Sequence, residues 1–439
     1  MNELYSILIL ILIDILVVTL SITLGYYNRV WIDASFQNTF YHSLSIYIHL
    51  YILYIIPLAM FLYENIYTKR YDFWNETRQI LKSLVISFIL VLAFLAMTQE
   101  IYGYSRAVII LTFIFMAILI PLSKYVTKHT LYNIGLWRKK ASVHSKDVYF
   151  KDEIFGNPYL GYIEASQKES KTIFIDSYKE DINMLKNLIN KEMKDNHEVI
   201  FIPLINEYDL TRSFIYNLSS RRRNLIVFNN RLKSTYKLWL KRFSDISIFI
   251  ILLPLFIPLF AFIALALRKS DSHSSILFKQ QRLGQHGNIF TCYKFRTMHE
   301  SSDAILKTYL EEHPDEHDYY NTYHKYKNDP RITKIGNFLR KTSLDELPQI
   351  FNILKSEMSF IGPRPYMLEE KDKLGNEIES ILIVRPGITG LWQVSGRNTL
   401  NFQSRVAMDS WYIKNWNLWI DFVILLKTIK TVLQRDGAS

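Results

Sequence analysis

The run LYSILILILIDILVVTLSITLG, residues 4–25, decides the fold, because Asp14 is its only charged side chain. About 20 apolar residues are enough to cross the hydrocarbon core of a bilayer as one helix. A cleaved signal peptide is the alternative for this run, but no basic segment precedes Leu4 and no small-residue cleavage site follows. Further apolar runs cover Leu44 to Tyr63, Ser83 to Thr98 and Ala107 to Leu122. We therefore expect residues 1–125 to form an α-helical bundle of four transmembrane helices.

The basic residues of the connecting segments predict an orientation. Arg29 alone follows the first run and Arg106 alone follows the third. The loop after the second run and the segment after the fourth are rich in basic residues: Lys69, Arg70, Arg78 and Lys82, then Lys124, Lys128, Arg138, Lys139 and Lys140. The positive-inside rule then places the N-terminus, the second loop and everything after Lys124 in the cytoplasm.

Composition narrows the class of protein. The chain has 439 residues, of which 49% are apolar and 21% charged, and this excludes a disordered or fibrous protein. Its single cysteine, Cys292, excludes a disulfide framework and a multi-cysteine zinc site. The 52 Lys and Arg residues outnumber the 41 Asp and Glu, giving a net charge of +11. Basic flanks beside anionic lipid explain this charge, so we expect no nucleic-acid partner.

Residues 141–235 change character, because short β-rich runs alternate with helical stretches such as Tyr178 to Met193. The expected strands are Thr172 to Ile175, Val199 to Pro203 and Asn224 to Phe228. This alternation predicts a small Rossmann-like α/β domain with a parallel sheet. No G-x-G-x-x-G motif follows a strand, so no dinucleotide is expected and a regulatory or dimerisation role is favoured over catalysis.

A fifth apolar run, Ile246 to Leu267, is long enough to span a bilayer. Basic pairs flank it on both sides, so both ends favour the cytoplasm. Pro254 and Pro258 lie in its middle, where each removes a backbone hydrogen bond and bends a helix. We therefore expect residues 246–267 to form a re-entrant membrane helix that bends at these prolines. The alternative is a kinked helix that spans the bilayer.

Beyond Lys279, basic residues lie beside glycine and proline in seven short motifs. These are Gln281-Arg282-Leu283-Gly284, Tyr293-Lys294-Phe295-Arg296-Thr297-Met298, Asp329-Pro330-Arg331-Ile332-Thr333-Lys334-Ile335-Gly336, Leu339-Arg340-Lys341-Thr342-Ser343-Leu344-Asp345-Glu346-Leu347-Pro348-Gln349, Gly362-Pro363-Arg364-Pro365, Arg385-Pro386-Gly387-Ile388-Thr389-Gly390 and Gly396-Arg397-Asn398. Guanidinium forks suit phosphate oxygens, and glycine lets backbone approach a polyanion. Together the motifs predict a diphosphate substrate near the membrane surface.

Asp345 and Glu346 form the only acidic pair in this cationic setting. Nearby arginines would keep both carboxylates ionised. One carboxylate could attack phosphorus and the other could hold a hard divalent cation. The alternative is a capping box, in which Glu346 reaches back to the amide of Ser343 at a helix start. Pro348 fits poorly in a helix that begins at Ser343, and Asp345 is not used by the box.

From Lys241 to the C-terminus, about 200 residues, the chain resembles the bacterial sugar transferases that move a sugar-1-phosphate onto polyprenyl phosphate. The resemblance is carried by Lys241-Arg242-x-x-Asp245 and by four of the motifs quoted above, those that contain Lys294, Asp345, Gly362 and Arg385. Their order and spacing match those of the family. The four N-terminal helices and the α/β domain resemble the large form of the family. The segment from Leu310 to Arg331 and the stretch Gly390 to Asn398 are most similar to members that transfer galactose phosphate to undecaprenyl phosphate. One departure is Ile257-Pro258, where members often carry Ser-Pro.

The resemblance implies a monotopic, mostly α-helical catalytic domain over residues 241–439, on the cytoplasmic face of the bacterial inner membrane. It implies that Asp345 attacks the sugar-bearing phosphate of a UDP-hexose and expels UMP, and that undecaprenyl phosphate then takes the phosphosugar. Galactose is the first expectation and glucose the second, and the product starts a surface polysaccharide such as O-antigen, capsule or exopolysaccharide. Glu346 is the expected ligand of Mg²⁺. The expected substrate-binding residues are Lys294, Arg296, Arg340, Arg364, Arg385, Arg397 and Asn398.

Two other functions compete with this one. A non-catalytic membrane scaffold for polysaccharide assembly would use the helices and the α/β domain to recruit partners, and the α/β domain also predicts a homodimer. A transporter is disfavoured, because the membrane runs carry few charges besides Asp14. The C-terminal stretch Trp411 to Leu433 suits either a helix in the headgroup plane or a helix packed on the catalytic core.

Overall fold

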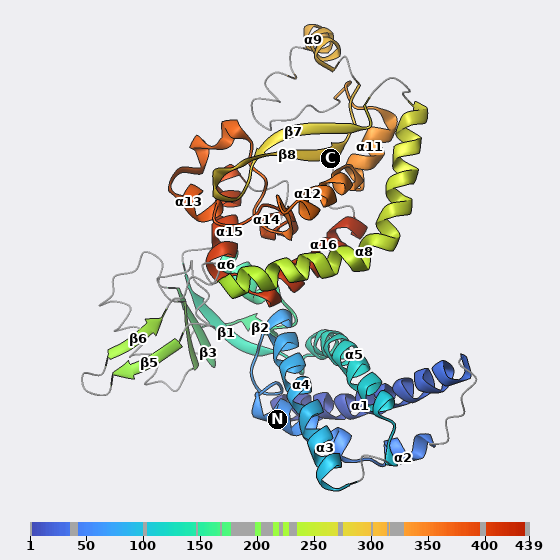
Figure 1. Ribbon diagram of the computed structural model, residues 1–439. Coiled ribbons are helices and arrows are strands. Elements are labelled where there is room, and N and C mark those ends of the chain that lie inside the picture. The colour runs from blue at the N-terminus through green and yellow to red at the C-terminus, as the bar shows by residue number, and fades with distance from the viewer. Residues whose placement is uncertain are drawn as a thin grey trace. The chain divides into compact units, whose positions relative to one another are not determined.

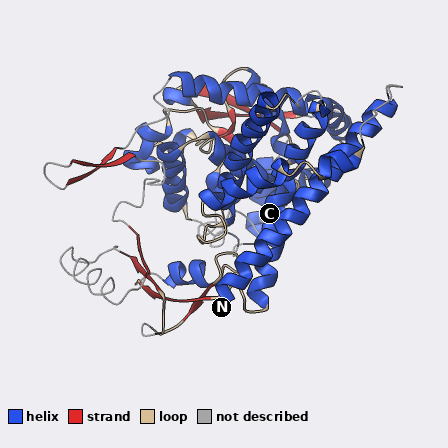
Figure 2. Ribbon diagram, turned by 90° about the horizontal axis from the view of Figure 1, so that it is seen from below, coloured by secondary structure: helices blue, strands red, loops and turns tan. Residues whose placement is uncertain are grey.

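The computed structural model describes residues 2–35, 43–99, 103–145, 148–166, 169–176, 198–202, 214–218, 223–227, 235–270, 275–299, 302–313, 316, 329–395 and 401–434. The chain divides into two compact units, Met1–Asn206 and Glu207–Ser439. Helices dominate, and strands form only small sheets (Figures 1 and 2). The expected helical hydrophobic bundle, small sheet and mostly helical C-terminal region are therefore observed.

The first unit begins with a bundle of helices (Figure 1): α1 (Asn2–Ser35), α2 (Leu44–Ile48), α3 (Ile52–Tyr63), α4 (Phe73–Met97) and α5 (Arg106–Asn133). Each expected apolar run lies in this helical region, although the second run is divided between α2 and α3. Helices α4 and α5 extend well beyond their apolar runs, because helical hydrogen bonding continues through polar residues outside a hydrophobic segment. In the described part of the chain, five helical segments are long and apolar enough to cross a membrane: four here and one at Leu238–Lys269.

Two ion pairs are buried inside the bundle. Lys124 of α5 lies 2.7 Å from Asp14 of α1, and Tyr67 donates a hydrogen bond of 2.7 Å to the same carboxylate. Lys128 of α5 pairs with Glu76 of α4. The four charged side chains are at most 1% exposed. Charges in such a place are tolerated only when they are paired, so these pairs fix how α1, α4 and α5 associate.

A four-stranded parallel sheet completes the described part of this unit, with the order β2-β1-β3-β4. Its elements are β1 (Lys139–His144), helix α6 (Val148–Phe155), β2 (Tyr162–Glu164), β3 (Thr172–Asp176) and β4 (Glu198–Ile202). The first two expected strands are confirmed as β3 and β4. The expected helix at Tyr178 to Met193 lies outside the described residues.

The third expected strand, Asn224 to Phe228, lies in an antiparallel hairpin and not in the expected parallel sheet. Residues Arg223–Val227 form β6, which pairs in antiparallel fashion with β5 (Phe214–Leu218) in the second unit. Only four residues separate the two strands, whereas a parallel pairing needs a crossover of a dozen or more. The short connection therefore requires a hairpin.

Helix α8 (Thr235–Ser270) opens the helical part of the second unit and contains Pro254 and Pro258. Figure 1 shows it as two arms that meet at a bend. One side of the helix packs on the domain, because Phe256 and Ile263 are buried and the rings of Phe260 and Phe295 lie 5.0 Å apart. The opposite side exposes large apolar residues such as Phe262 and Leu265.

The rest of the second unit surrounds an antiparallel hairpin of β7 (Leu277–Leu283) and β8 (Ile289–Phe295). A second, parallel pair joins β9 (Ser359–Ile361) to β10 (Gly387–Thr389). The helices are α9 (Ser302–Glu312), α11 (Lys334–Lys341), α12 (Ile350–Leu354), α13 (Ile378–Ile381), α14 (Leu391–Val394), α15 (Phe402–Asn415) and α16 (Leu418–Gln434), with short 3₁₀ helices at Gln285–Gly287, Leu344–Gln349, Leu368–Glu370 and Asp372–Glu377. The hydrophobic core joins α8, both strand pairs, α12 and α15.

The Lys241-Arg242-x-x-Asp245 motif attaches α8 to this core. Lys241 Nζ lies 2.9 Å from the Asp421 carboxylate, and Arg242 donates a hydrogen bond of 2.7 Å to the carbonyl oxygen of Ile353. Asp245 accepts hydrogen bonds from the side chain of Ser359 and from the amide of Phe360. The motif therefore positions the bent helix on the domain.

The C-terminal stretch forms two helices with a break at Trp416 and Asn417. Tyr412 and Trp416 are buried, and both donate hydrogen bonds to Asp421. This stretch therefore packs on the hydrophobic core of the second unit.

Candidate active site

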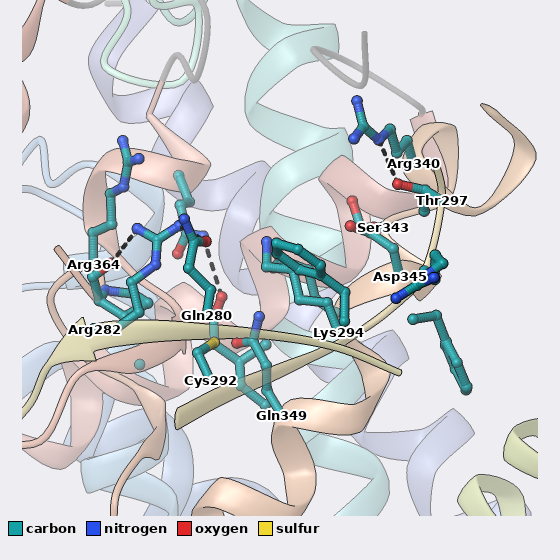
Figure 3. A pocket seen from close by; sticks show the side chains of 18 of the residues that line it. Gln280, Arg282, Cys292, Lys294, Thr297, Arg340, Ser343, Asp345, Gln349 and Arg364 are labelled. Atoms are coloured by element: carbon teal, nitrogen blue, oxygen red, sulfur yellow. Dashed lines mark hydrogen bonds and ion pairs between the residues drawn. The ribbon is translucent and has the colours of Figure 1, made fainter. Parts of the chain in front are cut away.

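A pocket of about 690 Å³ opens between the hairpin, the 3₁₀ helix Leu344–Gln349 and the β9–β10 pair. Within the described residues, its lining includes two carboxylates and six Lys or Arg side chains: Asp345 and Glu346, and Arg282, Lys294, Arg296, Arg340, Arg364 and Arg405. Figure 3 shows Asp345 and Arg340 at one end, Arg282 and Arg364 at the other, and Lys294 between them. We call this the cationic pocket. Its excess of positive charge suits a ligand with several phosphate charges.

Asp345 and Glu346 lie in the first turn of the 3₁₀ helix Leu344–Gln349. Ser343, immediately before it, has the left-handed backbone conformation with φ 55° and makes no side-chain capping hydrogen bond. The capping-box alternative is therefore wrong, because Glu346 turns instead toward Lys294. A left-handed serine costs conformational energy, and such residues concentrate at functional sites.

Lys294 of β8 lies next to the acidic pair, with its Nζ 2.7 Å from Glu346 Oε1. Burial would lower the pKa of this lysine, but the charges of Glu346 and Asp345 outweigh burial and raise the pKa. Lys294 is therefore a fixed positive charge in the pocket.

Asp345 is less acidic than an ordinary aspartic acid. Burial, followed by the charge of Glu346, raises the pKa of Asp345 to about 6, against the lowering effects of Lys294 and Arg340. Burial therefore outweighs the neighbouring cations in setting this pKa, although those cations still favour the ionised form that the sequence predicts. The group is still mainly ionised at pH 7.5, and a carboxylate with a raised pKa is a better nucleophile than an ordinary one.

Arg340 is positioned by contact between α11 and the end of β8. Its Nε donates a hydrogen bond of 2.9 Å to Thr297 Oγ1. Thr333 caps α11 by accepting a hydrogen bond from the Gly336 amide, and Gly336 lies directly against the backbone of Thr297. A Cβ atom at position 336 would be only 2.1 Å from the carbonyl oxygen of Thr297. Only glycine allows this approach.

We expect Gly336→Ala to move α11 away from Thr297 and to separate Arg340 from its partner. Overpacking of this kind costs about 1–3 kcal/mol of stability. The variant should therefore show a lower melting temperature in thermal unfolding and reduced activity of the pocket. Gly103→Ala is the control, since nothing lies within 4 Å of a Cβ at that position. Equal melting temperatures and equal activities of the two variants would contradict this account of Gly336.

The loop Gly362-Pro363-Arg364-Pro365 forms the other end of the pocket. Arg282 donates a hydrogen bond of 2.8 Å to the carbonyl oxygen of Pro365, and Asp409 of α15 accepts one of 3.0 Å from the Arg364 amide. Gly362 and Gly387 lie so close together that a Cβ on Gly387 would be 2.1 Å from the Gly362 nitrogen. These two glycines thus serve contact between two backbone segments, whereas the sequence suggested that they approach a polyanion.

The pocket gathers most of the expected site residues. Lys294, Arg296, Arg340, Asp345, Glu346 and Arg364 line it. Arg385 does not line the pocket; its Nε donates a hydrogen bond of 2.8 Å to the carbonyl oxygen of Ser356. Arg397 and Asn398 lie outside the described residues.

Sequence reasoning missed several lining residues, notably Arg405, Trp392, Gln393, Gln349 and Gln280. Arg405 carries no local signal, since its guanidinium lies 5.1 Å from the Trp392 ring only in the folded chain. Gln349 lies in the motif Leu339 to Gln349, and Trp392 and Gln393 lie in the stretch Gly390 to Asn398. Their side chains are neutral, so charge did not mark them as phosphate-binding residues.

The sequence of the chain is similar to those of known sugar transferases. A family model described as bacterial sugar transferase matches residues 236–435. The undecaprenyl-phosphate galactose phosphotransferase of Salmonella typhimurium is 34% identical over 406 residues, covering 85% of this chain and 84% of that protein. The chain belongs to the bacterial sugar transferase family. Membership makes it an enzyme, and the candidate membrane helices make it a membrane protein.

Two further relatives of the sugar transferase show how the similarity is distributed. An exopolysaccharide production protein of Rhizobium meliloti is 43% identical over 198 residues, which cover 45% of this chain and 87% of that protein. A UDP-glucose:undecaprenyl-phosphate glucose-1-phosphate transferase of Klebsiella pneumoniae is 31% identical over 283 residues, covering 61% of this chain and 55% of that one.

Proposed function

We propose that this sugar transferase moves hexose-1-phosphate from a UDP-hexose to undecaprenyl phosphate, giving undecaprenyl-diphosphate-hexose and UMP. The observation that carries the proposal is the Asp345–Glu346 pair inside a pocket that, among the described residues, is lined by six cationic side chains. The names of the relatives from Salmonella and Klebsiella support the same reaction. The product would start a surface polysaccharide, as the Rhizobium relative suggests.

The reaction would occur in two displacements at one phosphorus atom. First, an oxygen of Asp345 forms a bond to the sugar-bearing phosphorus while the bond to the UMP oxygen breaks, and UMP leaves with the electron pair. An oxygen of undecaprenyl phosphate then attacks the same phosphorus, and the bond to Asp345 breaks. The carboxylate is regenerated, so the covalent aspartyl phosphosugar is an intermediate.

The cationic side chains of the pocket serve both displacements. We assign phosphate binding to Lys294, Arg296, Arg340 and Arg364, with Arg397 and Asn398 as sequence-based predictions. Arg340 and Lys294 lie nearest the nucleophile in Figure 3, where negative charge develops on the transferring group. Fixed cations at that position stabilise the transition state without reorganisation.

The residues present fit Mg²⁺. Magnesium is commonly held by one or two carboxylates together with substrate phosphates and water. The described residues contain no cluster of three His, Cys, Asp or Glu side chains that could form a complete protein site. Glu346 would hold the ion, and Mg²⁺ would neutralise charge on the diphosphate.

The lipid substrate explains the bent helix α8. We propose that residues 246–267 enter the bilayer, bend at Pro254 and Pro258 and return to the same face. Basic residues at both ends and the apolar exposed side of the helix support this arrangement. It places residues 241–439 on the cytoplasmic face of the inner membrane, where undecaprenyl phosphate can reach the pocket. The homodimer predicted from the middle domain belongs to the same proposal.

Incubation of purified protein and undecaprenyl phosphate with a panel of UDP-sugars and Mg²⁺, with UMP release measured, tests the reaction. We expect UDP-galactose to be the best donor and UDP-glucose the second. If no UDP-hexose supports release above background, the proposed function is wrong.

The pH dependence tests the state of the nucleophile. Attack requires ionised Asp345, whose pKa is about 6. We therefore expect kcat/KM to be nearly constant above pH 7 and to fall by about tenfold per pH unit below 6. Arg340 lowers this pKa, so Arg340→Gln should move the acidic limb of the profile to higher pH. A limb that stays in place would show that another group controls it.

A further inference from the structure

Two neighbouring side chains of the cationic pocket have polar atoms without partners. Trp392 and Gln393 of α14 line the pocket and are each only 8% exposed. Within the described part of the chain, Trp392 Nε1 and Gln393 Oε1 have no hydrogen-bond partner. A buried polar atom without a partner costs free energy unless a ligand supplies the missing hydrogen bond. We therefore expect a bound ligand to supply hydrogen-bond partners for both atoms.

The hydrogen-bonding roles of these atoms are fixed. Indole nitrogen only donates. Gln393 Nε2 donates a hydrogen bond of 3.1 Å to the carbonyl oxygen of Ile388, so its Oε1 is left as an acceptor. A ligand that satisfies both atoms must accept from Trp392 and donate to Gln393. Ionised phosphate cannot do so, because its oxygens only accept.

The pair lies at the end of the pocket away from the nucleophile. The guanidinium groups of Arg364 and Arg405 lie 5.8 and 5.1 Å from the center of the Trp392 ring. Figure 3 shows Arg364 across the pocket from Asp345. In phosphoryl transfer the attacking and leaving oxygens lie roughly in line on opposite sides of phosphorus. UMP, leaving from an attack by Asp345, would therefore extend toward Arg364 and Trp392.

We propose that Trp392 and Gln393 recognise the uracil base of the sugar nucleotide. The imide edge of uracil presents an N3–H donor beside carbonyl acceptors. N3–H would donate to Gln393 Oε1, and a uracil carbonyl oxygen would accept from Trp392 Nε1. Arg364 and Arg405 then lie beside the phosphate of UMP. This inference rests on the proposed function, since it takes Asp345 as the nucleophile.

Binding of UMP and N3-methyl-UMP to the full-length protein in detergent, measured by calorimetry, tests the pairing. Methylation removes the N3–H donor and leaves Gln393 Oε1 unsatisfied, so wild-type protein should bind N3-methyl-UMP roughly 10- to 100-fold more weakly. This comparison needs no variant. Equal affinities for the two nucleotides would overturn the inference.

Variants separate the two contacts. Gln393→Leu should bind UMP about tenfold more weakly and lose most of the penalty for N3 methylation. Trp392→Phe should also weaken UMP binding but keep that penalty, because the acceptor remains. The matched control is Gln281→Leu, which removes an exposed glutamine of β7 that does not line the pocket and should change neither affinity.

Turnover assays distinguish this inference from the proposed function. If Gln393→Leu changes the preference between UDP-galactose and UDP-glucose but retains the N3-methyl penalty, the pair recognises the sugar and the inference is wrong. If wild-type protein transfers from UDP-hexoses yet binds both nucleotides equally, only the inference fails. If no UDP-hexose supports turnover, the proposed function fails as well.

Discussion

Asp345→Asn is expected to lower the rate of UMP release by at least about 10⁴-fold, because an amide cannot form the covalent bond to phosphorus. The change is nearly isosteric and leaves Lys294 and Arg340 in place, so substrate binding should survive. Steady-state assays with UDP-galactose and undecaprenyl phosphate provide the measurement. Asp372→Asn, at an exposed residue in the same unit, is the matched control and should retain full activity.

The same variant separates a transferase from a membrane scaffold. A scaffold needs no nucleophile, so Asp345→Asn would keep its role in polysaccharide assembly in cells. A transferase would lose surface polysaccharide although the variant protein is present in the membrane at normal amounts. Normal polysaccharide in cells that carry only the variant would contradict the enzymatic account.

Glu346→Gln is expected to lower kcat by about 10³-fold, somewhat less than loss of the nucleophile. The substitution removes the carboxylate assigned to Mg²⁺ and the partner of Lys294, which lies 2.7 Å away. Removing one well-placed electrostatic group typically costs about 10²- to 10³-fold, and a weakened metal site adds to this. Titration of activity with Mg²⁺ should show a higher half-saturating concentration in the variant.

Chelation provides an independent check on Glu346. Wild-type enzyme treated with EDTA should lose activity and regain it when Mg²⁺ is restored. Glu379→Gln, an exposed acidic residue on α13, should respond to Mg²⁺ as wild type does. Full activity of the wild-type protein in EDTA would contradict the assignment of a metal ligand to Glu346.

Local patterns in the sequence predict the hydrophobic helices and the acidic pair Asp345–Glu346, because both depend on neighbouring residues. Apolar runs locate α1, α4 and α5, although the runs in α4 and α5 are slightly short for a full span and these helices continue into polar sequence that the runs do not mark. The pairing of β6 was missed because strand propensity does not reveal the partner strand. The buried pair of Lys128 and Glu76 joins residues 52 positions apart, which no local pattern indicates.

The site shows the same division between local and distant information. Asp345 and Glu346 are adjacent in a motif, and their basic neighbours could be named from residue type. The left-handed backbone of Ser343 and the raised pKa of Asp345 depend on tertiary packing, since burial is a property of the folded chain. Arg385 is predicted from its motif to bind substrate, but it does not line the pocket. Its guanidinium instead donates a hydrogen bond to the carbonyl oxygen of Ser356. Charge alone did not separate a structural arginine from one that lines the pocket.

The most direct test of the central claim is mass spectrometry of the protein after incubation with UDP-galactose and Mg²⁺ in the absence of undecaprenyl phosphate. The account predicts that wild-type protein gains one hexose phosphate on the peptide that contains Asp345, and that added undecaprenyl phosphate removes it. A protein that releases UMP and transfers hexose phosphate to the lipid acceptor without ever carrying this modification, or that carries it equally after Asp345→Asn, would contradict the account.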